Sequence, residues 1–299
     1  MTVPFNGSIS RTQRVSLCVY SGFCTGVERA VRLAEGYLRE RPGQELYVTG
    51  DIVHNAGVMR RLTSIGLKRI EGDAPPVGKT VLVQAHGISP SVEEVLVKNH
   101  NRIINGTCPI LKANFDRFRL AEEQGFRSFL FGDRAHPEVE AIQGLLRDVV
   151  VFRDLEELSG LRNRVLTTDK IALIAQSTKP VDEYRRSAKM LVEQLKPQQL
   201  FQMHFSICAA TILREEEIKE KAPLFSTVFI VGGKHSANTK KLVLLAREQC
   251  PRVHWVEDVE EARGYLALIQ KSDTILIGGP PCQAYSLVGR ARNLGIKGY

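Results

Sequence analysis

The chain has 299 residues, of which 43% are hydrophobic and 25% charged, a composition typical of a globular protein with room for two or three packed domains. Its polar first segment, the absence of a long apolar run and the sparse spacing of its six cysteines predict a cytoplasmic protein with no membrane segment. The formal net charge of +8 suits an anionic substrate or an acidic protein, whereas scattered basic residues and the lack of a recognised motif argue against nucleic acid.

Strand-like and helix-like segments alternate along the chain, which predicts a layered α/β fold with mostly parallel sheets. The expected strands are 15–20, 45–49, 80–84, 128–131, 149–152, 171–175, 227–231, 253–256 and 274–277, and the clearest early helices are 27–39 and 56–64. A new cycle of alternation begins after Cys108 and again after Cys208. We therefore predict three similar small α/β units, at 1–107, 108–198 and 199–299.

Three cysteines, Cys24, Cys108 and Cys208, each lie at the predicted start of a helix. The unpaired N–H groups and the partial positive charge of a helix N-terminus favour the thiolate over the thiol. No Cys-x-x-Cys pair is present, which argues against a zinc finger or a dithiol redox site. Three separate thiolates suit a [4Fe–4S] cluster with one open iron, while three buried, reduced cysteines in unrelated helices are the alternative.

Several predicted strands end in loops that contain Gly, Ser, Asn and His. In parallel sheets, ligands bind beyond the carboxyl ends of the strands, where such loops can donate hydrogen bonds to phosphate. Each loop taken alone is better explained as an ordinary turn, but six of them together with the three cysteines favour one shared polar site. In His136-Pro137-Glu138, a histidine and a carboxylate two residues apart can relay protons, the alternative being a surface turn.

Taken in order, these motifs resemble the 4-hydroxy-3-methylbut-2-enyl diphosphate reductase family, which completes the methylerythritol phosphate route to isoprenoid precursors. The resemblance extends from about Val15 to Leu287. It lies in Gly-Phe-Cys-Thr-Gly-Val, Ile-Val-His-Asn, Ala-His-Gly-Ile-Ser, Thr-Cys-Pro, His-Pro-Glu-Val-Glu, Gln-Ser-Thr, Ile-Cys-Ala-Ala-Thr and Gly-Gly-Lys-His-Ser-Ala-Asn.

The resemblance implies an oxidoreductase in which three α/β units surround a [4Fe–4S] cluster. Cys24, Cys108 and Cys208 match the family's three cluster ligands, and the open iron takes the allylic hydroxyl of the substrate. Two electrons, from a ferredoxin or a flavodoxin, and protons then remove that hydroxyl as water. The products are isopentenyl and dimethylallyl diphosphates.

The resemblance also implies roles for the polar loops. The three histidines His54, His86 and His136 match those around the substrate's diphosphate, and Ser236 and Asn238 match a loop that hydrogen-bonds it. Glu138, two residues after His136, matches the acid that delivers protons. Ser177 or Thr178 matches the family hydroxyl that positions the hydroxyl group of the substrate. Cys282 stands where the family has a serine that donates to the diphosphate.

This chain departs from the family pattern mainly in the diphosphate loops. Ala237 and Cys282 replace two serines, and Ala175-Gln176-Ser177-Thr178 replaces Thr-Gln-Thr-Thr. Val19-Tyr20-Ser21 and Leu213-Arg214-Glu215 replace Asn-Pro-Arg and Asn-Arg-Gln. The pattern therefore supports the cluster more strongly than the substrate. The alternatives are a homologue that reduces another allylic or phosphorylated substrate, or a non-catalytic iron–sulfur sensor, although a sensor needs no proton donor such as Glu138.

Overall fold

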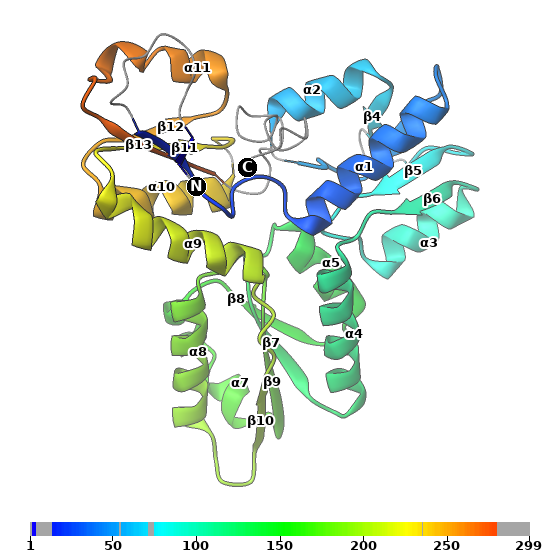
Figure 1. Cartoon of the computed structure of the whole chain (residues 1–299). Helices are drawn as coiled ribbons and strands as arrows, with labels where there is room; N and C mark the ends of the chain where they lie inside the picture. The colour runs from blue at the N-terminus through cyan, green and yellow to red at the C-terminus, as the bar shows by residue number, and fades with distance from the viewer. Residues whose placement is uncertain (1, 4–13, 54, 71–74, 235, 280–299) are drawn as a thin grey trace. The chain divides into compact units, whose positions relative to one another are not determined.

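The computed structural model describes residues 2–3, 14–53, 55–70, 75–234 and 236–279, and it confirms the predicted α/β fold (Figure 1). The described residues form three separate sheets, and all but one of the neighbouring strand pairs in them are parallel. Within the described ranges, no helix is both long and apolar enough to cross a membrane.

The first sheet has four parallel strands in the order β4-β3-β5-β6. Its strands are β3 (Leu46–Val48), β4 (Leu67–Arg69), β5 (Thr80–Val83) and β6 (Arg102–Asn105). The helices of this part of the chain are α1 (Thr25–Glu40), α2 (Ala56–Ser64) and α3 (Pro90–Lys98). Helix α3 begins at a favourable sequence signal, because Ser89 caps it and proline occupies its first position.

The second sheet also has four parallel strands, in the order β10-β9-β7-β8. Its strands are β7 (Arg127–Phe131), β8 (Val149–Phe152), β9 (Lys170–Ala175) and β10 (Leu200–Met203). The accompanying helices are α4 (Pro109–Glu123), α5 (Pro137–Leu145), α6 (Leu155–Gly160), α7 (Arg162–Leu166) and α8 (Val181–Gln194). Phe118 of α4 and Ile142 of α5 pack with Leu130 and Ile174 of the sheet, which fixes both helices against it.

The third sheet has the order β1-β2-β13-β11-β12, and only β1 is antiparallel to its neighbour. Its strands are β1 (Thr2–Val3), β2 (Arg14–Leu17), β11 (Thr227–Val231), β12 (Val253–Val256) and β13 (Thr274–Gly278). The helices are α9 (Ala209–Lys221), α10 (Ala237–Gln249) and α11 (Val259–Arg263), with 3₁₀ turns at Ala222–Leu224 and Leu266–Leu268. Ile218 of α9 and Leu242 of α10 pack on Ile230 and Leu276.

The number of sheets agrees with the three expected units, but strand pairing crosses the predicted boundaries. Strand β2, from the expected first unit, pairs with β13, and β10, from the expected third, pairs with β9. By internal contacts the chain divides into two compact units, one of residues 1–31, 51–65 and 209–299 and the other of residues 32–50 and 66–208. The third sheet lies in the former and the first two sheets in the latter. The boundaries after 107 and 198 stay a prediction.

Candidate active site

Glu138 is a buried carboxylic acid in the first turn of α5, with only 1% of its surface exposed. The backbone N–H of Ser177 donates to its Oε1 and the Ser177 hydroxyl donates to its Oε2, both at 2.7 Å. Burial raises the pKa of Glu138 to about 7, and the two hydrogen bonds from Ser177 only partly oppose that rise. Glu138 can therefore hold a proton near neutral pH and release it.

His136 caps the same helix. Its Nδ1 accepts a hydrogen bond from the backbone N–H of Glu138 at 3.2 Å, which leaves Nε2 as the ring nitrogen that can donate. The ring of His86, in the turn after β5, meets the His136 ring edge-on with 5.1 Å between centroids. The fold thus brings together two of the three predicted histidines.

Thr178 is oriented by Gln176, a residue that the sequence analysis did not assign to the site. Gln176 is buried, and its Nε2 donates to Thr178 Oγ1 at 2.8 Å while its Oε1 accepts the backbone N–H of Asp133 at 3.0 Å. Because the Thr178 oxygen already accepts a hydrogen bond, its own O–H is left to donate. Gln176 thereby links the ends of β7 and β9 and fixes the threonine beside Ser177.

Cys208 is held against the same strand ends. Its backbone N–H donates to the carbonyl of Ser177 at 2.8 Å, and Ser206 Oγ bonds both the N–H and the carbonyl of Ala175 at 2.8 and 2.7 Å. The amide of Asn114, on α4, donates to the carbonyl of Ser206 at 3.3 Å. The loop that carries Cys208 is therefore tied both to β9 and to the helix that Cys108 starts.

Cys108 is the N-cap residue of α4, as predicted, and Pro109 occupies the first helical position. The backbone N–H of Cys108 donates to the carbonyl of Ala85 at 3.0 Å, and its carbonyl accepts from Lys112 at 2.9 Å. Gly106 packs so closely on the carbonyl of Val83 that a Cβ atom there would collide with it. The backbone of Cys108 is thus hydrogen-bonded to Ala85, which follows β5 and directly precedes His86 in the sequence.

The other compact unit holds Cys24 and the predicted hydrogen-bonding loop. Cys24 immediately precedes α1, and its carbonyl accepts the N–H of Glu28 at 2.9 Å, which makes it the residue at the helix start, as predicted. Ser236 caps α10 by accepting the N–H of Thr239 at 3.3 Å, and Asn238 lies in the first turn. His54, Cys282 and the side chain of Ala237 lie outside the described residues.

None of the five described cysteines forms a disulfide, and they fall into two classes. Cys18 and Cys250 are buried in the apolar cluster between α9, α10 and the third sheet. Cys24, Cys108 and Cys208 are partly exposed, each at a helix start, so as a donor set they fit thiolate ligands to iron. Among the residues that the structure describes, no three His, Cys, Asp or Glu side chains are grouped to hold a metal ion, and the three cysteines are divided between the two units.

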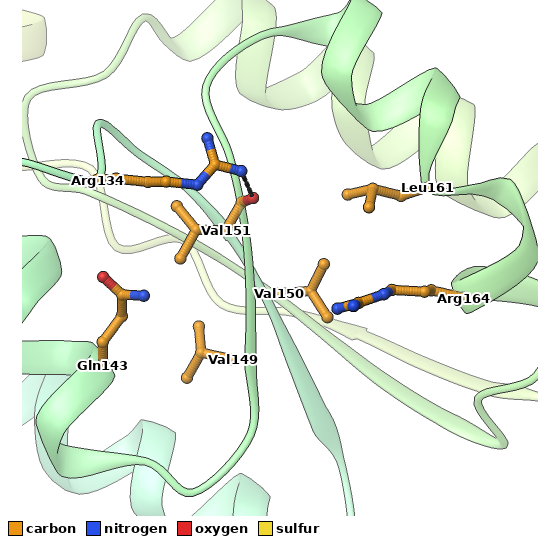
Figure 2. A pocket seen from close by; sticks show the side chains of 7 residues that line it. All are labelled: Arg134, Gln143, Val149, Val150, Val151, Leu161 and Arg164. Carbon is orange, nitrogen blue, oxygen red and sulfur yellow. Dashed lines mark hydrogen bonds between the residues drawn. The ribbon is translucent and has the colours of Figure 1, made fainter.

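A cavity of about 310 Å³ lies elsewhere, at the edge strand β8 (Figure 2). Arg134 and Arg164 flank it, with Val149, Val150 and Val151 between them. Arg134 donates to the carbonyl of Val151 at 2.6 Å and to Glu157 at 2.7 Å, so its guanidinium protects the open edge of the sheet. None of the predicted site residues lines this cavity.

Comparison with known proteins shows the family to which this sequence is similar. The model of the family described as LytB protein matches residues 15–280. The 4-hydroxy-3-methylbut-2-enyl diphosphate reductase of Aquifex aeolicus is 32% identical, over 83% of this chain and 84% of its own, and that of Thermotoga neapolitana is 37% identical over 80% of each chain.

Two solved structures support the likeness. A structure of (E)-4-hydroxy-3-methyl-but-2-enyl diphosphate reductase, described as the terminal enzyme of the non-mevalonate pathway, has a TM-score of 0.69 and 27% identity, covering 95% of this chain and 100% of its own. The reductase from Plasmodium falciparum has a TM-score of 0.77 at 23% identity, covering 94% of this chain and 86% of its own, and so supports the fold alone.

Proposed function

The chain belongs to the LytB family, and on that premise we propose that it is an iron–sulfur oxidoreductase that removes the allylic hydroxyl of 4-hydroxy-3-methylbut-2-enyl diphosphate. The substrate and the reaction are those for which its curated relatives are named. The observation in this chain that carries the proposal is the buried acid Glu138, which Ser177 holds beside His136.

The reaction is a two-electron reduction. The allylic C–O bond breaks, its oxygen leaves as water after taking a proton, and a second proton joins carbon to give isopentenyl or dimethylallyl diphosphate. A [4Fe–4S] cluster on Cys24, Cys108 and Cys208, with one iron free of cysteine, would supply the electrons one at a time. A ferredoxin or a flavodoxin would in turn reduce the cluster, and the net charge of +8 suits such acidic partners.

Glu138 is the proposed proton donor. With a pKa of about 7 it is partly protonated at neutral pH, the condition in which general-acid catalysis works best. When Glu138 is protonated on Oε2, the carboxylic acid donates a hydrogen bond to the Ser177 hydroxyl oxygen. The O–H of Ser177 then points away from Glu138. In this proposal Ser177 passes a proton from Glu138 Oε2 to the leaving hydroxyl, and Thr178 donates a hydrogen bond to the same group.

The diphosphate is the proposed ligand of the remaining polar residues. The protonated Nε2 of His136 is a suitable donor to phosphate oxygens, and His86 lies against the same ring. His54, Ser236, Asn238 and Cys282 complete the proposed binding set. A sensor would need no buried proton donor, so the Glu138–Ser177 pair favours an enzyme over the non-catalytic alternative. The cytoplasm is the compartment that we propose.

The test is an anaerobic one. Protein reconstituted with iron and sulfide is analysed for both elements and then assayed for reduction of 4-hydroxy-3-methylbut-2-enyl diphosphate with a chemical reductant. Bound iron with turnover supports the proposal. Bound iron without turnover favours another allylic substrate or a sensor, and failure to bind iron under any reconstitution overturns the proposed cofactor and the reaction with it.

A further inference from the structure

Helix α9 contains a buried carboxylate that binds the backbone just before Cys24. The side chain of Glu217 is only 4% exposed. Its Oε1 accepts the N–H of Val19 at 2.6 Å and its Oε2 accepts the N–H of Tyr20 at 2.9 Å. Lys221, one turn later, donates to Oε1 at 2.6 Å and balances the charge. Both oxygens of the carboxylate are thus used to hold a short stretch of loop.

Arg214, three residues earlier on the same face of α9, binds the next part of that loop. The guanidinium is buried, and its Nη2 donates to the carbonyl of Gly22 at 3.3 Å while its Nη1 donates to the carbonyl of Ala210 at 2.5 Å. Gly22 has a φ of +99°, which favours glycine at this turn. The loop between β2 and Cys24 is therefore fastened to α9 at Val19, Tyr20 and Gly22.

The burial of two charged side chains, Arg214 and Glu217, costs free energy, so the position at which the chain buries them is informative. A buried charged group loses its hydration, and apolar residues of similar volume are often as stable or more so. Here both backbone hydrogen bonds of Glu217, and one of the two from Arg214, go to the loop between β2 and Cys24, the last of them at Gly22. The same loop carries Val19-Tyr20-Ser21, where this chain differs from the family pattern. Such an arrangement fixes geometry more than it adds stability.

We propose that Glu217 and Arg214 are positioning residues that hold Cys24 in the place from which it binds iron. The inference rests on the proposed function, because it takes Cys24 to be an iron ligand. It adds that the ligand's position is set by the helix that begins directly after Cys208, and not by the β2–α1 turn alone. Neither residue touches substrate in this proposal.

Two variants test it, each matched to a control on the same helix. Glu217→Gln keeps the shape but faces one backbone N–H with an amide N–H, and Arg214→Lys keeps the charge but loses the fork that reaches Gly22. Glu216→Gln and Lys219→Gln change the same chemistry on exposed positions of α9. For each protein, three quantities are measured: hydrogen exchange of the Val19 and Tyr20 amides in apoprotein, the rate at which a chelator removes iron from reconstituted protein, and the electron paramagnetic resonance spectrum of the reduced cluster.

For Glu217→Gln we expect about tenfold faster exchange of the two amides, about tenfold faster iron loss and an altered spectrum, because one hydrogen bond to a charged group is lost. Arg214→Lys should change the iron loss and the spectrum in the same direction, and it replaces Glu217→Gln if that variant does not fold. The controls should match the wild type. Faster exchange with unchanged iron loss and spectrum would mean a purely structural clamp and overturns the inference alone. A wild type that binds no iron overturns the proposed function, and the inference falls with it.

Discussion

Ser177 donates its backbone N–H to one carboxylate oxygen of Glu138 and its hydroxyl to the other, both at 2.7 Å. Two such bonds would ordinarily stabilise the ionised carboxylate and lower its pKa. Burial works in the opposite direction and is the larger effect, so the pKa of Glu138 rises to about 7. The pair therefore combines a proton that is available at neutral pH with a hydroxyl that can carry it.

Replacing Glu138 by glutamine should abolish most of the turnover. The glutamine side chain has the same shape and can still accept from the Ser177 N–H, but it has no acidic proton to donate. General-acid catalysis contributes about 10²–10⁴-fold in rate, and we expect a fall in kcat of that order with unchanged iron content. Glu140→Gln, at an exposed position on the same helix, is the control and should retain wild-type kcat. Normal turnover by Glu138→Gln would exclude Glu138 as the donor.

The same carboxyl should make stability depend on pH. The folded pKa of about 7 lies above the reference value of 4.5, so the protonated form is favoured in the folded state. The stabilisation is fully present below pH 4.5 and is lost as the pH rises through 7, by up to about 3 kcal/mol. Urea unfolding of apoprotein at about pH 4 and about pH 8, on either side of this window, should therefore show a wild type that weakens relative to Glu138→Gln at the higher pH. An equal difference at both pH values would contradict the raised pKa.

The sequence predicts most of the strands because the central strands of parallel sheets are continuous apolar runs. The strands expected at 149–152, 227–231 and 253–256 are found with those bounds. The strand expected at 15–20 ends at Leu17 instead, because the N–H groups of Val19 and Tyr20 bond to Glu217 and not to a neighbouring strand. The short strands β4 and β6 give no such signal, because β4 contains one apolar residue, Leu67, and β6 only two, Ile103 and Ile104.

Some residues of the candidate site could likewise be predicted from the sequence, and others could not. Cys108 could be placed at a helix start from its local sequence alone, since proline follows it. Gln176 and Glu217 could not be assigned, because a polar residue looks solvated until distant segments bury it. Their only signal was position: Gln176 follows an apolar strand, and Glu217 lies one helical turn after Leu213-Arg214, a segment in which the family pattern already changes.

Gln176 should matter both for stability and for activity. Gln176→Leu leaves the N–H of Asp133 without its partner and frees the Thr178 hydroxyl. This bond is only part-buried, so water replaces it in part, and we expect the free energy of unfolding, measured in urea, to fall by about 1 kcal/mol. Turnover should fall several-fold more than iron content does, because Thr178 is no longer oriented. Gln143→Leu, at an exposed position on α5, should change neither quantity.

Two glycine substitutions should have opposite effects on stability. Gly106→Ala places a Cβ atom against the carbonyl of Val83, a rigid backbone group, and should displace the loop that carries Cys108. Gly36 lies within α1, and nothing stands within 4 Å of a Cβ atom there. Gly36→Ala should therefore stabilise by about 0.5–1 kcal/mol, as alanine does for glycine inside helices. Thermal unfolding of the apoproteins checks both, and a stable Gly106→Ala protein would show that the Cys108 loop adapts.

Replacing any one of Cys24, Cys108 and Cys208 by serine should remove most of the iron from the reconstituted protein, because a hydroxyl then replaces a thiolate ligand. Cys250→Ala is the matched control. Its thiol is buried in the apolar cluster beside α10, so we expect full iron content and a loss of roughly 1 kcal/mol in unfolding free energy. Iron and sulfide analysis of anaerobically reconstituted protein makes the comparison. Full iron in any of the three serine variants would remove that cysteine from the ligand set, whereas iron loss in Cys250→Ala would show that cluster binding follows stability and not ligation.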